Sequence, residues 1–140
     1  MYSAIVVGTN GSETAEQAVA HAAALAQANN AALHVVASMP VRTVSGGGVA
    51  GALVIDTRED VEAILADAVK ALERDGLTVH THALQLDPAQ ALVDVAKQVG
   101  ADLVVVGNKG MKGAKRFVLG SVPNSVAHNA PCAVLIVKTS

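Results

Sequence analysis

The sequence predicts a single α/β domain over residues 1–140, built on an open, twisted parallel sheet of five strands. Short, continuously apolar runs alternate along the chain with longer segments of helical periodicity. The length of 140 residues is enough to bury one continuous core. Apolar residues make up 51% of the chain and aromatic residues only 1%, so the core consists of aliphatic side chains, which suit a sheet covered by closely packed helices.

The N-terminal part of the chain predicts two strands and the helix between them. Ala4–Gly8 is a short apolar run that ends in glycine, which is typical of a strand buried on both faces. Thr14–Asn29 has apolar residues at helical spacing, and Thr14 and Gln17 have the spacing of a capping box at its start. Leu33–Ser38 is the second apolar run, and we expect a second strand there.

The middle of the chain predicts a loop, a helix and an edge strand. Met39–Asp56 contains a proline and three consecutive glycines, and we expect a mobile loop. Arg58–Asp75 has a regular apolar stripe and stops before a glycine, so it predicts a helix, with Asp56 or Thr57 as its cap. Thr78–Leu84 alternates between apolar and polar residues, which indicates an edge strand with one wetter face.

The C-terminal part continues the alternation of helices and strands. Asp87 and Pro88 have the residue types of a helix N-cap and first turn, and Gly100 ends the apolar stripe that follows. The remaining predicted elements are a buried strand, a short helix and a last strand: Leu103–Gly107, Ser121–Asn129 and Ala133–Lys138.

This succession of elements predicts right-handed crossovers and helices on both faces of the sheet. The first and fourth strands are the most apolar, so we place them side by side in the centre, which gives the Rossmann-like strand order 3-2-1-4-5. Ligands of such sheets bind beyond the carboxyl ends of the strands where the order reverses. Two loops leave that point, and they contain residues Gly8–Ser12 and Gly107–Gly110.

The loop after the fourth strand has the composition of a phosphate site. Gly107 and Gly110 are followed, after nine residues, by Gly120 and Ser121 at the start of the last helix. Glycines let a ligand approach the backbone, and free amides at a helix N-terminus favour phosphate. Basic residues add positive charge to the same region: Lys109, Lys112, Lys115 and Arg116. The alternative is that the glycines are ordinary turn residues in a solvated loop.

The Gly-x-x-Gly-x9-Gly-Ser spacing, the Gly-Thr-Asn-Gly-Ser loop after the first strand and the Pro-Cys-Ala-Val-Leu-Ile-Val ending resemble the nucleotide-binding branch of the universal stress protein family. The resemblance covers essentially the whole chain and implies an adenine nucleotide as ligand, with ATP expected and cyclic AMP as the alternative. The ligand contacts it implies are Gly8, Thr9 and Asn10, the backbone of Val35 for adenine, and Gly107, Asn108, Lys109, Gly110, Lys112, Gly120, Ser121 and Val122 around ribose and phosphates. It also implies a homodimer paired through Ala133–Val137, where an exposed apolar edge is an independent reason to expect a partner.

Asn10 stands where the family usually has aspartate. Because magnesium prefers carboxylate ligands, we expect it to bind only together with ATP. We expect the amide of Asn10 to weaken that binding. Asn10 thereby favours cyclic AMP, which needs no metal. No residue is assigned a catalytic role, and hydrolysis of ATP is expected to be slow at most. Two further hypotheses stay open: a weak ATP hydrolase, and a structural dimer without a ligand.

Composition argues against several other classes of function. The formal net charge of −2 offers no general attraction for nucleic acid or anionic membranes. No signal peptide and no apolar run long enough to cross a membrane are visible, so we expect a cytoplasmic protein. The single cysteine, Cys132, is expected to be a small core residue. His80 and His82 share one face of a strand, but without an evident third ligand we expect a solvated edge rather than a metal site.

Overall fold

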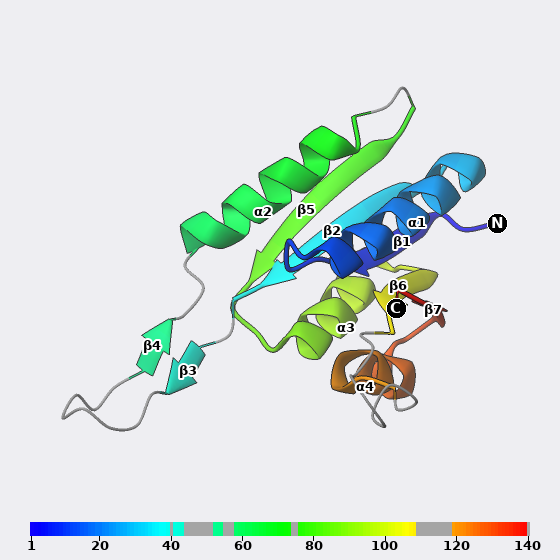
Figure 1. Cartoon of the computed structure of the whole chain (residues 1–140). Helices are drawn as coiled ribbons and strands as arrows, with labels where there is room; N and C mark the ends of the chain where they lie inside the picture. The colour runs from blue at the N-terminus through cyan, green and yellow to red at the C-terminus, as the bar shows by residue number, and fades with distance from the viewer. Residues whose placement is uncertain (40, 44–51, 55–57, 74–75, 109–118, 140) are drawn as a thin grey trace.

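The computed structural model of the chain describes residues 1–39, 41–43, 52–54, 58–73, 76–108 and 119–139. Strands and helices alternate along it, except for two short strands that directly follow the second strand, as Figure 1 shows. In chain order the elements are β1 (Ala4–Gly8), α1 (Glu13–Asn29), β2 (Ala32–Ser38), β3 (Val41–Thr43), β4 (Ala52–Val54), α2 (Arg58–Ala71), β5 (Thr78–Leu84), α3 (Pro88–Val99), β6 (Leu103–Gly107), α4 (Ser121–Asn129) and β7 (Ala133–Val137).

Five parallel strands form the main sheet in the order β5-β2-β1-β6-β7. Counted along the chain without the short β3 and β4, this is the predicted order 3-2-1-4-5, and the predicted fold class is confirmed. In the centre, Val6 of β1 lies opposite His34 of β2 and Val104 of β6. Gly8 and Gly107 end the two central strands, so their loops leave the sheet where the strand order reverses.

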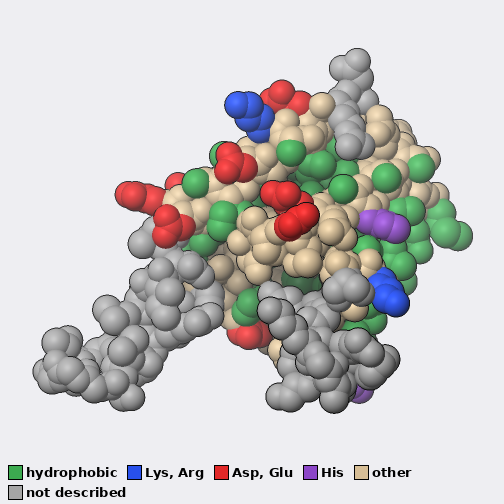
Figure 2. All heavy atoms as spheres, in the orientation of Figure 1, with side chains coloured by type: hydrophobic (Ala, Val, Ile, Leu, Met, Phe, Trp, Pro, Cys, Tyr) green, Lys and Arg blue, Asp and Glu red, His purple; other side chains and the backbone are tan. Residues whose placement is uncertain are grey.

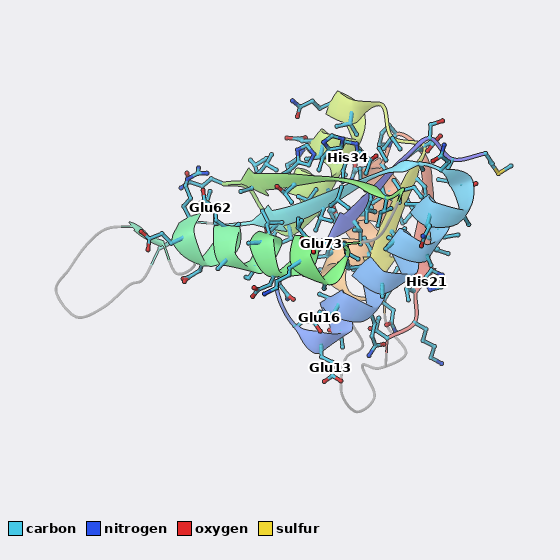
Figure 3. All side chains as sticks on the ribbon, turned by 90° about the horizontal axis from the view of Figure 1, so that it is seen from above. Glu13, Glu16, His21, His34, Glu62 and Glu73 are labelled. Atoms are coloured by element: carbon cyan, nitrogen blue, oxygen red, sulfur yellow. The ribbon has the colours of Figure 1, made fainter. Side chains whose placement is uncertain are left out.

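Helices cover both faces of this sheet. Helices α1 and α2 lie on one face and α3 on the other, as the view in Figure 3 shows, and α4 packs against α3. Successive residues of β1 therefore enter different cores: Val7 packs with residues of α1 and α2, and Val6 packs with residues of α3 and α4. Both valines are fully buried. On the outside, acidic side chains gather over α2, as Figure 2 shows.

The start of α1 differs from the predicted capping box. The helix begins at Glu13 and its N-cap is Ser12, whose Oγ accepts a hydrogen bond from the amide of Ala15 at 3.2 Å. Thr14 lies inside the first turn, and its hydroxyl is 3.2 Å from that of Ser12. The prediction failed because Ser12 and Thr14 are both good capping residues, and the sharp turn at Gly11 selects the earlier one.

The segment that was expected to be only a loop contains two short strands. β3 and β4 pair antiparallel, with Val41 opposite Val54, and form a separate two-stranded sheet. The expected caps of α2, Asp56 and Thr57, lie outside the described residues. Thr78–Leu84 is an edge strand, as predicted. Among the described helices, none has the length and apolar character needed to cross a membrane.

Candidate functional site

A cleft of about 180 Å³ opens at the carboxyl ends of the central strands, where the sequence predicted a ligand site. Its walls come from the loop after β1, from the ends of β2 and β6, from the first turns of three helices and from Thr139 beyond β7. The described residues that line it are Gly8, Thr9, Asn10, Ser12, Thr14, Ala15, Ala18, Val36, Ser38, Pro88, Leu92, Val106, Gly107, Val122, Pro123 and Thr139.

The loop after β1 is held in shape by short hydrogen bonds. The amide of Thr9 donates to the carbonyl oxygen of Val36 at 2.9 Å, which ties the loop to β2. Thr9 Oγ1 accepts from the amide of Gly11 at 3.1 Å, and Asn10 Oδ1 accepts from the amide of Ser12 at 3.0 Å. Gly11 has a φ of 81°, which glycine tolerates better than other residues. The loop therefore presents a preformed wall to the cleft.

The start of α4 lacks a side-chain cap. Its N-cap is Gly120, which has no side chain to bond the first amides of the helix. Pro123 has no amide hydrogen, and the amide of Asn124 donates to the carbonyl oxygen of Gly120 at 3.0 Å. Among the described residues, no hydrogen bond uses the amides of Ser121 and Val122. These two donors, at the positive end of the helix dipole, suit an anion.

The electrostatic character of the cleft comes from helix ends rather than from charged side chains. The first turns of α1, α3 and α4 all contribute to its lining, through Ala15, Pro88 and Val122. None of the described lining residues carries a charge. Glu13 and Glu16 of the first turn of α1 are exposed and point away from the sheet, as Figure 3 shows. The described part of the cleft thus joins apolar side chains to neutral polar groups. Of the three helix starts, those of α1 and α3 are capped by the side chains of Ser12 and Asp87, so only the uncapped start of α4 is open to an anion.

The predicted ligand residues fall into three groups. Five line the cleft: Gly8, Thr9, Asn10, Gly107 and Val122. Gly120 and Ser121 directly precede Val122 at the start of α4, whereas Val35 and Asn108 are not in the lining. The Val35 side chain is fully buried in the core beneath α1 and α2, and the Asn108 side chain bonds Thr139. Lys109, Gly110 and Lys112 lie outside the described residues.

Sequence reasoning missed the apolar side chains Val36 and Leu92, which we call the floor of the cleft, and Thr139 on one wall. Val36 and Ser38 could have been found, because alternate residues of a strand share a face and the chain leaves β2 at Ser38. Leu92 belongs to the apolar stripe of α3, and packing the helix on the sheet brings it within 3.2 Å of the position that a Cβ on Gly8 would occupy. Thr139 gave no sequence signal, because it follows the last strand and reaches the cleft only through the sheet.

Three histidines meet on β2 and β5, outside the cleft lining. Nδ1 of His34 and Nε2 of His82 are 2.9 Å apart in a hydrogen bond, and the rings of His34 and His80 stack with centroids 4.9 Å apart. Strand pairing brings the three together, because it places His34 opposite His80. Even so, no group of three side chains in the described part of the chain has the arrangement of a metal site.

Burial and the neighbouring imidazoles lower the pKa values of His34 and His82. For His34 the larger cause is burial, followed by the charges that His82 and His80 carry when protonated. The hydrogen bond between His34 and His82 also favours a neutral imidazole, because one of the two rings must offer an unprotonated nitrogen as acceptor. The pair is therefore held with at least one neutral imidazole.

Cys132 is half-buried and packs against the core beneath α3 and α4. Burial and the nearby Asp102 carboxylate raise the pKa of its thiol. A raised pKa disfavours the thiolate, which is the reactive form of cysteine. The position agrees with the predicted role as a small core residue.

The parallel sheet with a cleft at its switch point defines an open α/β fold, in which the crevice beyond the strand ends is the usual place for a ligand. A family model described as the universal stress protein family matches residues 1–138. A universal stress protein of Methanocaldococcus jannaschii is 33% identical, over 99% of this chain and 83% of that protein. A putative universal stress protein of Staphylococcus haemolyticus is 31% identical, over 99% of this chain and 86% of that protein. The chain belongs to the universal stress protein family.

Solved structures of the family share this architecture. A universal stress protein in complex with cAMP is 34% identical and superposes with a TM-score of 0.73, covering 99% of this chain and 98% of that one. A universal stress protein of Archaeoglobus fulgidus in complex with dAMP is 29% identical and superposes with a TM-score of 0.69, covering 98% of each chain.

Proposed function

We propose that this protein binds an adenine nucleotide in the cleft and acts as a nucleotide-responsive regulator. The observation that supports this most is the pairing of an apolar floor with the uncapped start of α4 in one cleft. A nucleotide matches these two parts of the cleft, since its flat, largely apolar base suits the floor and its anionic phosphate suits the helix start. The two similar proteins whose structures contain cAMP and dAMP support the same class of ligand.

The phosphate is proposed to lie at the amides of Ser121 and Val122. Those two donors are free among the described residues, and the helix dipole adds to their attraction for an anion. The loop between Gly107 and Gly120 adds four basic residues and no acidic one in its sequence. The base is proposed to lie over the apolar floor formed by side chains such as Val36 and Leu92.

A monophosphate, cyclic AMP or AMP, fits the described cleft better than magnesium with ATP. Magnesium that bridges phosphates is usually held by one or two carboxylates, and the described lining has none. Asn10, where the family usually has aspartate, has an amide oxygen that already accepts a hydrogen bond from Ser12. ATP, which was the first expectation from the sequence, becomes the second candidate here, supported by the four basic residues between Gly107 and Gly120, whose charge suits further phosphates. Slow hydrolysis of ATP is proposed only as a side activity of that complex.

Calorimetry with cyclic AMP, AMP and ATP, each with and without magnesium, tests this proposal. The informative variant is Gly120→Val, which puts a branched side chain where the phosphate is expected. Gly120 has φ −60° and ψ 161°, a conformation open to any residue, so the substitution adds no backbone strain. Ala130→Val is the matched control, because Ala130 has φ −64° and ψ 143° at the other end of the same helix.

We expect the wild type and Ala130→Val to bind a mononucleotide with similar affinity. Gly120→Val should bind it at least about tenfold more weakly, which corresponds to about 1.4 kcal/mol of binding free energy. Circular dichroism and a thermal melt establish that each variant is folded. If folded Gly120→Val binds as tightly as the control, the phosphate position is wrong. If the wild type binds none of the three nucleotides, the proposed function itself is wrong.

We also propose a homodimer formed through β7. This strand pairs with β6 on one side only, and no other described strand covers its outer edge. Ala133 is exposed and Ile136 is 38% exposed, which is unusual for a strand of such apolar sequence. Sedimentation of the wild type and of Ile136→Lys tests the interface: a dimer that becomes a monomer supports it, and a wild-type monomer contradicts it.

A further inference from the structure

One wall of the cleft is made by a residue beyond the last strand. Thr139 lines the cleft together with Gly107, although it is not part of the glycine-rich spacing. It follows β7, whose Val137 pairs with Gly107 in the sheet. The pairing of β7 with β6 thus brings Thr139 to the side of the cleft where Gly107 lies.

Asn108 clamps this residue in place with its side-chain oxygen. Asn108 Oδ1 accepts a hydrogen bond from the amide of Thr139 at 2.9 Å and another from Thr139 Oγ1 at 3.0 Å. The amide of Asn108 also donates to the carbonyl oxygen of Val137 at 2.9 Å. The orientation of the Asn108 carboxamide is unambiguous, because the backbone amide of Thr139 can only donate and must therefore face an oxygen.

This clamp decides which hydrogen bonds Thr139 has left for a ligand. A hydroxyl has one proton to donate and two lone pairs to accept with. The proton of Thr139 is used on Asn108 Oδ1, which cannot donate in return. What remains on Thr139 Oγ1 is acceptor capacity. A phosphate oxygen, which is itself an acceptor, gains nothing from it, whereas a ligand hydroxyl can donate to it.

We propose that Thr139 selects for a ribose hydroxyl of the bound nucleotide, and that Asn108 is the positioning residue that sets Thr139 as an acceptor. This rests on the proposed function and adds to it a preference for ribonucleotides over deoxyribonucleotides. The ribose is the part of the ligand that lies between the phosphate at the start of α4 and the base on the apolar floor. Gly107, Val122 and Thr139 border the same cleft, so a sugar there is within reach of all three.

The test compares AMP with 2′-deoxy-AMP and 3′-deoxy-AMP by calorimetry, for the wild type and for Thr139→Val. Valine has nearly the same shape as threonine, and the backbone bond of residue 139 to Asn108 is kept. Thr81→Val is the matched control, because Thr81 is exposed on the edge strand β5 and does not line the cleft. We expect the wild type and the control to prefer AMP over one deoxy form by about 2- to 10-fold, which is the net effect of one hydrogen bond.

Thr139→Val is expected to bind that deoxy form with the same affinity as the wild type. It should bind AMP more weakly than the wild type does, so that the preference for AMP is lost. Asn108→Ala should lose the preference too, although its side chain does not line the cleft. Asn108→Asp should restore it, because a carboxylate oxygen accepts both bonds from Thr139. Its added charge lowers the affinity for all three nucleotides without changing their ratio.

The outcomes separate the two proposals. If the wild type binds the three nucleotides equally, or if Thr139→Val keeps the wild-type preference, the role of Thr139 is refuted while nucleotide binding stands. If Asn108→Ala keeps the preference, the positioning role of Asn108 is refuted. If the wild type binds none of the three, the proposed function fails and the selection by Thr139 fails with it.

Discussion

Replacing Gly11 by alanine tests whether the loop after β1 is held in a conformation that only glycine adopts easily. Gly11 has a φ of +81°, in the left-handed region, and a Cβ there would lie 3.2 Å from Cγ1 of Ile64 on α2. Two penalties therefore add. The left-handed conformation costs an alanine about 1–2 kcal/mol, and the contact with Ile64 forces a small shift that costs about 1 kcal/mol more.

Gly76→Ala separates these two penalties. Gly76 has nearly the same φ, +83°, but a Cβ there would have no neighbour within 4 Å. Both substitutions also stiffen the unfolded chain, which favours the folded state by about 0.4–1 kcal/mol in each case and cancels in the comparison. We expect losses in the free energy of unfolding of about 1 kcal/mol for Gly76→Ala and about 2 kcal/mol for Gly11→Ala.

Urea unfolding monitored by circular dichroism measures the difference, and thermal melts should show it as a further fall of about 3 °C in Tm for Gly11→Ala. A third variant, the double substitution Gly11→Ala with Ile64→Ala, should show coupling, because the contact is then absent. Equal destabilisation by Gly11→Ala and Gly76→Ala, or additive effects in the double variant, would refute the packing of Gly11 against α2. Gly11→Ala should also weaken nucleotide binding, since residues on both sides of it line the cleft.

Three further predictions concern the cap, the histidines and the metal. Ser12→Ala should lower the free energy of unfolding by about 1 kcal/mol in urea titrations, because Ser12 is the N-cap of α1, whereas Thr14→Ala, expected from a capping box to do the same, should cost clearly less. The free energy of unfolding should be constant above the ordinary histidine pKa of 6.5 and fall as the pH drops below it, because His34 and His82 bind protons more weakly in the folded state than in the unfolded one. Urea midpoints measured along a pH series should show this fall, and its slope against pH should be smaller in His34→Gln. Asn10→Asp should strengthen ATP binding in the presence of magnesium and leave cyclic AMP binding without metal no tighter, as calorimetry can check; equal changes for both ligands would contradict the role given to this position.

Much of the cleft's location could be predicted because it depends on local patterns. Apolar runs that end in glycine identified β1 and β6, and the alternation of strands with helices implied crossovers of one hand. Those two facts place the loops after Gly8 and Gly107 at the same end of the sheet. Helix starts follow strand ends in such a chain, so the dipoles that favour an anion are implied by the same pattern.

The sequence by itself therefore determined the class of fold, the strand order and the end of the sheet at which the cleft opens. The tertiary structure alone decided which side chains meet there. Strand register put His34 against His80 and His82, and the pairing of β6 with β7 brought Thr139 to Asn108. The physical reason is that hydrophobic periodicity is written within single elements, whereas a contact between distant segments depends on how whole strands and helices pack, which neither segment encodes alone.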